Sequence, residues 1–200
     1  MVKSHIDKSM LMDAINGASG DVGLIDDQTE TIVEEFVDCK LRQCGRKPLM
    51  HKKPVDLRTE NLVDKLVDIS EELENRYGAQ LNRDAELWIE TATFERFVQI
   101  AKGVFSDGHI SWSRIVVLFM FAAKVVCVAL ARNLGGLVGD VIRFVVKFIF
   151  LRGIHQWIQT RGGWLGVLQD YGTGTTTNGL VVFTGLLLLA LMASKFTMWK

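Results

Sequence analysis

Cysteine and proline are scarce in this 200-residue chain, and neither sign of charge predominates. The chain contains two prolines and three cysteines, and 23 basic residues balance 23 acidic ones. The odd, low cysteine count argues against a disulfide-stabilised secreted scaffold and fits a reducing compartment. The net charge of zero argues against a nucleic-acid partner, because DNA- and RNA-binding proteins concentrate basic residues on one face. The length is sufficient for one domain with its own core.

Motifs of enzymes and of metal sites are also missing. The sequence has no glycine-rich phosphate loop, no nucleophile elbow and no helical zinc-binding pair of histidines. Glu71 and Glu72 are neighbours on a predicted helix and point in different directions, so they make a poor acid–base pair. Cys39, Cys44 and His51 lack standard zinc spacing and a fourth ligand. We therefore expect a protein that is not an enzyme and that uses no metal or other cofactor.

The two ends of the chain differ in hydrophobicity. The N-terminus lacks the apolar core and cleavage site of a signal peptide, and we interpret residues 1–28 as a flexible segment. Residues 171–194 contain no charged side chain. A membrane-spanning helix needs about 20 mostly apolar residues, so we expect a C-terminal tail anchor at 173–200, with a buried core helix as the alternative. The residues assigned to this anchor are Leu180, Phe183, Leu187 and Leu191.

Helical periodicity is present in the first half of the chain. Thr29 is a suitable cap for a helix that begins near Glu30, and Gly45 is a suitable terminator. Both prolines fall in the segment 45–55, which we interpret as a loop. Beyond it, apolar residues recur at spacings of three and four, with charged residues between them, which predicts an amphipathic helix over 57–81. An ordinary core-facing surface helix has the same pattern.

Further helices are predicted in the second half. A third helical stretch runs from about Ala92 to Phe105 and is followed by a turn at 106–109. Residues 115–130 are hydrophobic on every side and are interrupted only by Lys124, which is typical of a bundle centre or a membrane segment. A buried strand is also compatible with their many β-branched residues, but the length favours a helix.

The central apolar helix has a predicted partner and two short successors. A second apolar stretch covers about 134–151, and the bend between the two contains Asn133. Short helices are predicted at 154–160 and 164–171, with a glycine pair between them. We therefore expect an all-α domain over 29–172. It should contain about eight helices around a central apolar hairpin, with the tail anchor as a ninth.

Four segments resemble, in the same order, the homology regions of the Bcl-2 family of apoptosis regulators. TIVEEFVDCKLRQCG (31–45) resembles the fourth region and LVDISEEL (66–73) the third. FSDGHISWSRIV (105–116) resembles the first and WIQTRGGW (157–164) the second. LFMFAAKVV (118–126) is similar to the central helix of the Bax-type effectors of this family, and RFVVKFIF (143–150) and ENRYG (74–78) resemble the Bak-type effectors. The 31–45 segment resembles the pro-survival members at least as much.

This resemblance implies a Bcl-type helical bundle and a role in apoptosis. The favoured expectation is a pro-apoptotic effector that oligomerises and permeabilises the mitochondrial outer membrane, controlled by helix-in-groove binding. The alternative is a pro-survival member that sequesters pro-apoptotic helices in the same groove. Expected partners are such amphipathic helices, other Bcl-type proteins, further copies of this chain and outer-membrane lipid. The expected location is the mitochondrial outer membrane, tail-anchored and facing the cytosol, with a cytosolic pool as a further possibility.

The resemblance also assigns roles to individual residues. The helix of the third homology region contains Leu62, Leu66, Ile69, Ser70, Glu71 and Leu73. The residues assigned to the groove are Phe97, Ile100, Val104, Trp112, Arg114, Val117 and Phe121. Packing residues of the second region are Trp157, Gly162, Gly163 and Trp164.

The chain departs from the family pattern at three positions. Ser70 and Ser113 stand where the family has glycines, and Glu71 stands where it has an aspartate. In the family, the arginine that corresponds to Arg114 pairs with the aspartate of an incoming helix, and the glycines let the two helices approach closely. Either the helices pack further apart here, or the serine hydroxyls find hydrogen-bond partners. Arg114 could also cap its own turn or be solvated.

Overall fold

The computed structural model describes residues 21–49 and 55–172. This part of the chain contains seven helices and no strand, which confirms the all-α prediction. The predicted tail anchor, with Leu180, Phe183, Leu187 and Leu191, lies outside the described residues. The helices are α2 (Asp21–Gln43), α3 (Leu57–Ile89), α4 (Phe94–Val104), α5 (Trp112–Ala131), α6 (Leu137–Leu151), α7 (Ile154–Thr160) and α8 (Gly166–Gly172).

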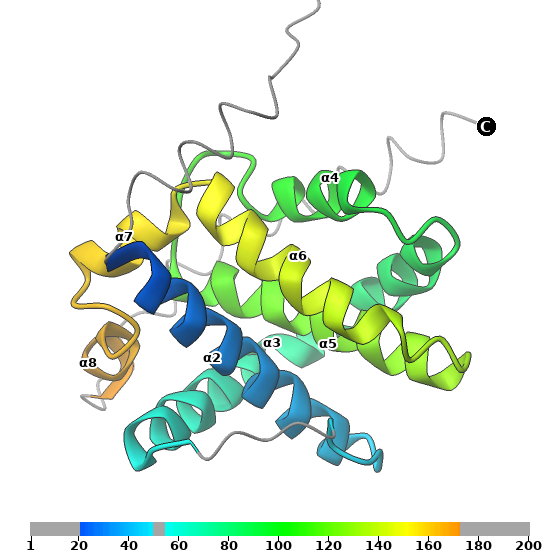
Figure 1. Cartoon of the computed structure of the whole chain (residues 1–200), viewed down its shortest axis with the longest axis horizontal. Helices are drawn as coiled ribbons and strands as arrows, with labels where there is room; N and C mark the ends of the chain where they lie inside the picture. Colours follow the sequence, from blue (N-terminus) through cyan, green and yellow to red (C-terminus); the bar gives the residue numbers. More distant parts are fainter. Residues whose placement is uncertain (1–20, 50–54, 173–200) are drawn as a thin grey trace, which may run out of the picture.

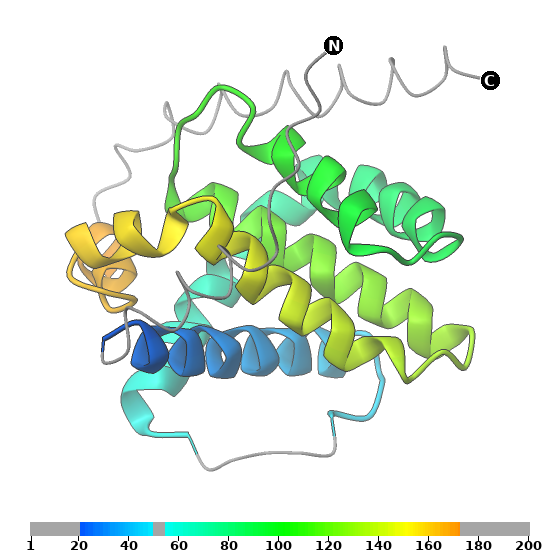
Figure 2. The ribbon, with the colours of Figure 1, turned by 45° about the horizontal axis from the view of Figure 1, so that its top comes forward.

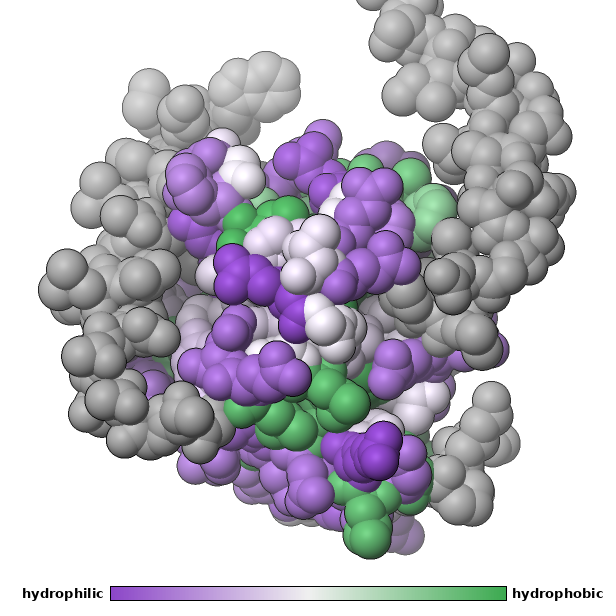
Figure 3. Space-filling view, turned by 90° about the vertical axis from the view of Figure 1, so that its left-hand side faces the viewer, coloured by the Kyte–Doolittle hydropathy of each residue, from purple (hydrophilic) through white to green (hydrophobic). Residues whose placement is uncertain are grey.

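Helix α5 forms the centre of the bundle. Figures 1 and 2 show α2, α3, α4 and α6 packed around it, and α7 and α8 close one end. Helix α5 carries apolar side chains on every side, and only a helix at the centre of the bundle can bury all of them. The strand alternative for residues 115–130 is therefore wrong. The face that carries α7 and α8 is mostly hydrophilic, with small separate hydrophobic patches (Figure 3).

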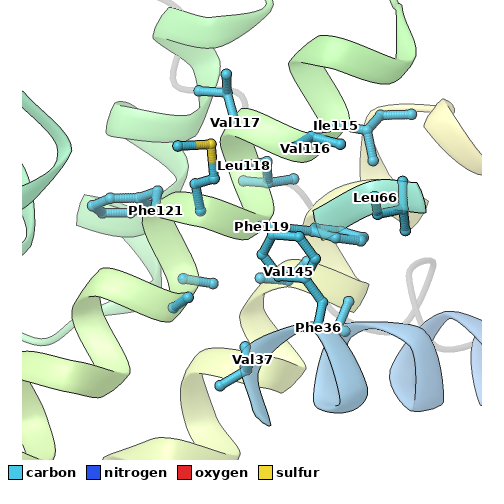
Figure 4. Packing of buried hydrophobic residues seen from close by; sticks show 14 of the residues in the cluster. Phe36, Val37, Leu66, Ile115, Val116, Val117, Leu118, Phe119, Phe121 and Val145 are labelled. Atoms are coloured by element: carbon cyan, nitrogen blue, oxygen red, sulfur yellow. The ribbon is translucent and has the colours of Figure 1, made fainter. Parts of the chain in front are cut away.

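The core is formed where α5 meets its neighbours. Phe119 of α5 lies edge-on to Phe36 of α2, with 5.6 Å between the ring centroids. Leu66 of α3 and Val145 of α6 also lie in this part of the core (Figure 4), and all four side chains are fully buried. Burying a side chain of this size contributes about 1.5–3 kcal/mol relative to leaving it exposed. The hydrophobic contacts of α5 therefore provide much of the stability of the bundle.

Several predicted helix boundaries are wrong. Helix α2 begins at Asp21 and not near Glu30, so residues 21–28 are helical and do not belong to a flexible segment. Thr29 is consequently not a cap but a buried residue within α2. Helix α3 continues beyond the predicted end at 81 to Ile89, because further residues extend its buried stripe. Helix α8 begins two residues later than predicted, at Gly166.

Local signals explain where most helices begin and end. Asp56, Thr93 and Ser111 are N-caps of α3, α4 and α5, because each side chain accepts a hydrogen bond from a backbone N–H in the first turn. Asn133, with φ of +58°, lies in the predicted bend between α5 and α6. Gly162 and Gly163 have φ of +84° and +75°, and they turn the chain between α7 and α8 as predicted.

Candidate helix-binding site

The apolar stripe of α3 faces the core. Leu62, Leu66, Ile69 and Leu73 are at most 5% exposed, and α3 packs mainly against α5. Glu71 lies on the opposite side, where its carboxylate accepts a hydrogen bond from the side-chain amide of Gln43 at 3.0 Å. The four predicted apolar anchors therefore stabilise the monomer in this conformation. These side chains can contact another molecule only after α3 separates from α5.

Ser70 on the same helix has found two hydrogen-bond partners. Its hydroxyl donates to the carbonyl of Val67 at 2.6 Å and accepts from the Lys40 ammonium at 3.2 Å. Both Ser70 and Lys40 are buried. A buried cation needs polar partners, because the loss of water otherwise costs several kcal/mol. The serine that replaces the family's glycine thus provides an acceptor for a lysine of α2.

Arg114 is held by the turn that precedes α5. Its guanidinium donates to both carboxylate oxygens of Asp107, one of them at 2.7 Å, and to the carbonyl of His109 at 2.7 Å. The Arg114 side chain is only 10% exposed. The hydrogen-bonded guanidinium holds the pKa of the Asp107 carboxyl well below its usual range. Arg114, which we expect to bind an acidic residue of an incoming helix, thus already binds an acidic residue of its own chain.

Ser113 and Trp112 connect the start of α5 to the end of α8. The hydroxyls of Ser113 and Tyr171 are 3.0 Å apart, and the indole nitrogen of Trp112 donates to the Asp170 carboxylate at 2.8 Å. The hydroxyl of Ser113, like that of Ser70, therefore has a hydrogen-bond partner inside the protein. Because Tyr171 lies at the end of α8, these bonds fix the point from which the chain continues to the predicted tail anchor.

The residues assigned to the groove are mostly buried. Phe97 of α4 packs on Phe121 of α5 and on Phe144 of α6, with ring centroids 5.5 and 5.9 Å apart. Val104, Trp112 and Val117 are at most 6% exposed, and Ile100 is half-buried. The structure brings these residues together along α4 and α5. Their apolar side chains are in contact with the bundle in this conformation.

The tryptophans of the second homology region have packing roles. The Trp157 and Trp164 rings lie 5.0 and 5.9 Å from the Trp112 ring, measured between centroids. The Trp164 indole nitrogen also donates to the Thr29 hydroxyl of α2 at 3.1 Å. This cluster joins the first and second homology regions to α2. It supports the interpretation of Trp157 and Trp164 as structural residues.

One ion pair connects α3 to the central helix α5. The Lys124 ammonium, which is the only charge in the middle of α5, donates to the Glu74 carboxylate of α3. The side chains of Lys124 and Glu74 are 17% and 35% exposed. Removing one partner would leave the other charge poorly solvated, so this pair favours α3 in its resting place.

Sequence reasoning identified Arg114, Ser70 and Ser113 but missed their partners. Asp107 is seven residues before Arg114, and only the turn between them brings the two side chains together. Lys40 and Tyr171 are distant in sequence from the serines they bind. The one available signal was Lys40 itself, because it lies on the apolar side of a helix and therefore requires a buried acceptor.

Comparisons with known proteins show the relatives of this chain. A family model described as "Apoptosis regulator proteins, Bcl-2 family" matches residues 62–164. The chain is 32% identical to the Homo sapiens apoptosis regulator BAX over 161 residues, which is 80% of each protein. It is 33% identical to the Homo sapiens Bcl-2 homologous antagonist/killer over 133 residues, covering 66% of this chain and 62% of that protein.

Solved structures share the fold. Chicken BOK superimposes with a TM-score of 0.66 at 18% identity, covering 74% of this chain and 98% of BOK. Trichoplax adhaerens trBcl-2L2, bound to trBak BH3, gives a TM-score of 0.64 at 19% identity, covering 74% of this chain and 99% of that one.

Proposed function

Because this chain belongs to the Bcl-2 family of apoptosis regulators, we propose that it is a pro-apoptotic effector that oligomerises and permeabilises the mitochondrial outer membrane. The observation that carries this proposal is the similarity to BAX, which extends over four fifths of both proteins. The similarity to the antagonist/killer protein points in the same direction. In this view the protein has no catalytic activity and works through protein and lipid contacts.

The central hairpin supports a membrane-active role. Among the described residues, α5 alone is long and apolar enough to span a membrane by length and composition, although most of it is buried in the bundle. Its 20 residues correspond to about 30 Å, close to the thickness of the hydrocarbon core of a bilayer. In water, exposing this apolar surface would cost about 25 cal/mol per Å², so the surrounding helices must cover it. In lipid that cost disappears, so the chain has an alternative state of low energy.

Release of α3 would begin the conversion. Its stripe of Leu62, Leu66, Ile69 and Leu73 has the spacing of a helix that fills an apolar groove. Release separates this stripe from α5 and breaks the Lys124–Glu74 ion pair. A partner helix that binds the released state better than the resting state would shift the population toward release. The exposed stripe could then enter the groove of a second copy and produce an oligomer.

The proposed binding groove lies along α4 and the start of α5. Phe97, Ile100, Val104, Val117 and Phe121 supply its apolar lining, and Arg114 supplies its cation. The BH3 complex of trBcl-2L2, a protein of the same fold, supports helix binding as the mode of control. Because Arg114 is bound to Asp107 at rest, an acidic residue of the incoming helix would have to replace or share this partner.

We further propose that the protein acts at the mitochondrial outer membrane, with residues 173–200 as its anchor and the bundle facing the cytosol. A pro-survival function is the second candidate, because the 31–45 segment also resembles the fourth homology region of pro-survival members. In that case the groove would capture pro-apoptotic helices and retain them, and α3 would stay in the core.

Dye release from liposomes distinguishes the two candidates. The purified full-length protein is added to vesicles of outer-mitochondrial lipid composition, alone and with an activating BH3 peptide. An effector releases the dye in the presence of the peptide, and chemical cross-linking detects its oligomers. A pro-survival protein binds the peptide without releasing dye, and it also suppresses release caused by added BAX.

A further inference from the structure

Two cysteines from distant parts of the chain lie side by side. The sulfur atoms of Cys44 and Cys127 are 3.8 Å apart, although 83 positions separate them in the sequence. Cys44 is exposed in the turn that follows α2, and Cys127 is half-buried on α5. Helices α2 and α5 pack directly against each other, so the thiol pair lies where the end of one helix meets the side of the other.

We propose that Cys44 and Cys127 are a redox-sensitive modification site that closes to a disulfide when a peroxide oxidises the protein. The peroxide first converts the Cys44 thiolate to a sulfenic acid and is itself reduced to water. The Cys127 sulfur then attacks the Cys44 sulfur, the S–O bond breaks, and the oxygen leaves as a second water with the remaining protons. Two thiols and one hydrogen peroxide thus give one disulfide and two waters.

The surroundings of the two thiols give them different roles. Burial raises the pKa of the Cys127 thiol to about 11, although Arg46 and Lys124 oppose this shift. Cys127 is therefore a poor first target for peroxide, because the thiolate is the reactive form. Cys44 is exposed and accessible to a small oxidant. Cys44 would react with the peroxide first. The Cys127 sulfur, which lies 3.8 Å from the Cys44 sulfur, would then attack the sulfenic acid and form the disulfide.

The geometry permits closure with a small movement. A disulfide has a sulfur–sulfur distance of about 2.05 Å, so the two atoms must approach by somewhat less than 2 Å. Cys44 lies outside α2, next to Gly45 with its φ of +68°. The backbone N–H of Cys44 donates to the carbonyls of Lys40 and Leu41 at 3.1 Å, so rotation of the Cys44 side chain and a small shift of the turn must supply this movement. The other cysteine, Cys39, lies within α2, where its sulfur accepts a hydrogen bond from the Arg42 guanidinium at 3.5 Å.

The predicted consequence is a covalent clamp between α2 and α5. It would oppose any change that separates these helices, and this part of the inference rests on the proposed effector function. If α5 must leave α2 to enter lipid, the oxidised protein should be held in its resting state. A reductant such as dithiothreitol should restore activity, because the bond is reversible by thiol exchange.

Peptide mapping tests the pair itself. The full-length protein and the variants Cys39→Ser, Cys44→Ser and Cys127→Ser are treated with hydrogen peroxide and digested with trypsin without reduction. Trypsin places the three cysteines on separate peptides, 9–40, 43–46 and 125–132. We expect peptides 43–46 and 125–132 to be linked in the parent and in Cys39→Ser, and unlinked in the other two variants. In the parent protein, a link to Cys39, a link between two molecules on a non-reducing gel, or an oxidised Cys44 that stays unlinked would overturn the proposal.

Two further measurements test the clamp. The midpoint of thermal unfolding should rise on oxidation of Cys39→Ser and stay constant for Cys44→Ser, because the disulfide restricts the unfolded chain. Peptide-activated dye release by Cys39→Ser should fall at least ten-fold on oxidation and recover with dithiothreitol. A linked protein with unchanged midpoint and unchanged release would contradict the clamp. If reduced protein releases no dye at all, the effector function fails, and the midpoint alone decides whether the clamp exists.

Discussion

The guanidinium of Arg114 binds the carboxylate of Asp107 through two hydrogen bonds, one of them 2.7 Å long. The pair closes the turn between α4 and α5 and leaves little of the Arg114 side chain exposed. In the proposed mechanism the same guanidinium recognises an acidic residue of an incoming helix. Asp107 is therefore an internal competitor for that residue, and the competition can be measured.

Replacing Arg114 by alanine should weaken the binding of a BH3 peptide by roughly ten- to a hundred-fold. A hydrogen bond to a charged group contributes about 1.5–3 kcal/mol, and about 1.4 kcal/mol corresponds to a factor of ten. Asp107→Asn should have the opposite effect, because the guanidinium loses its internal anion. Titration calorimetry measures both. The control is Asp107→Asn in the Arg114→Ala background, where no tightening is expected. Equal affinity of Arg114→Ala and the parent would remove Arg114 from the binding site.

The same ion pair should affect stability in a defined pH range. The pKa of Asp107 is lower in the folded protein than in the unfolded chain, where a value of about 3.9 is usual. Its stabilisation is thus fully present above the unfolded pKa and is lost as the pH falls through the folded pKa. The difference in urea unfolding between the parent and Asp107→Asn should not decrease between pH 7 and 5. The difference should shrink only below about pH 4; a decrease already at pH 6 would contradict the assignment.

Removing the hydrogen bond between Ser113 and Tyr171 should destabilise the protein by about 0.5–1.5 kcal/mol, the usual contribution of one such bond. Tyr171→Phe and Ser113→Ala each delete one hydroxyl, and the double variant should lose little more than either single one. Urea unfolding of the four proteins provides the coupling energy. Fully additive losses would show that the two hydroxyls do not interact.

Leu66→Glu should abolish self-association. Leu66 is fully buried in the resting fold, and a glutamate there cannot be buried cheaply in the bundle or in a partner's groove. The matched control is Leu57→Glu on the same helix, at a position that is 77% exposed. Circular dichroism must show that both variants remain helical. Cross-linking after activation should then detect oligomers only for Leu57→Glu, and a folded Leu66→Glu protein that still oligomerises would exclude α3 as the contact.

The sequence predicts the helices better than it predicts the side-chain contacts between them. The apolar spacing in α3, α5 and α6 indicated these helices because a helix with one buried side, or with all sides buried, leaves a periodic pattern. The start of α2 was missed because residues 21–28 contain three acidic residues and a glycine beside three apolar residues, so the apolar pattern is weak there. Helix α2 nevertheless includes these residues, and its Thr29 hydroxyl accepts a hydrogen bond from the indole of Trp164.

Partners of polar residues depend on how helices cross, which periodicity does not specify. Ser70 and Ser113 were recognised as departures from the family pattern, and the sequence left open whether their hydroxyls would find partners. The structure answers this with Lys40 and Tyr171, which are 30 and 58 positions away. The contact between Cys44 and Cys127 is of the same kind, because it depends on the register between α2 and α5.

Truncation after Tyr171 should release the protein from membranes. This variant removes the uncharged C-terminal run but keeps the Tyr171 hydroxyl that binds Ser113, so the fold should remain intact. Extraction of mitochondrial membranes with alkaline carbonate should leave the full-length chain in the pellet and the truncated chain in the supernatant. Equal retention of the two proteins would disprove the tail anchor.

Cytochrome c release from mitochondria that lack both BAX and the antagonist/killer protein tests the effector function most directly. The full-length protein is added with and without a BH3 peptide, and Leu66→Glu and Leu57→Glu serve as matched variants. We predict release by the parent and by Leu57→Glu in the presence of the peptide, and none by Leu66→Glu. The account would be contradicted by a parent protein that binds the peptide, releases no cytochrome c, and blocks the release caused by added BAX.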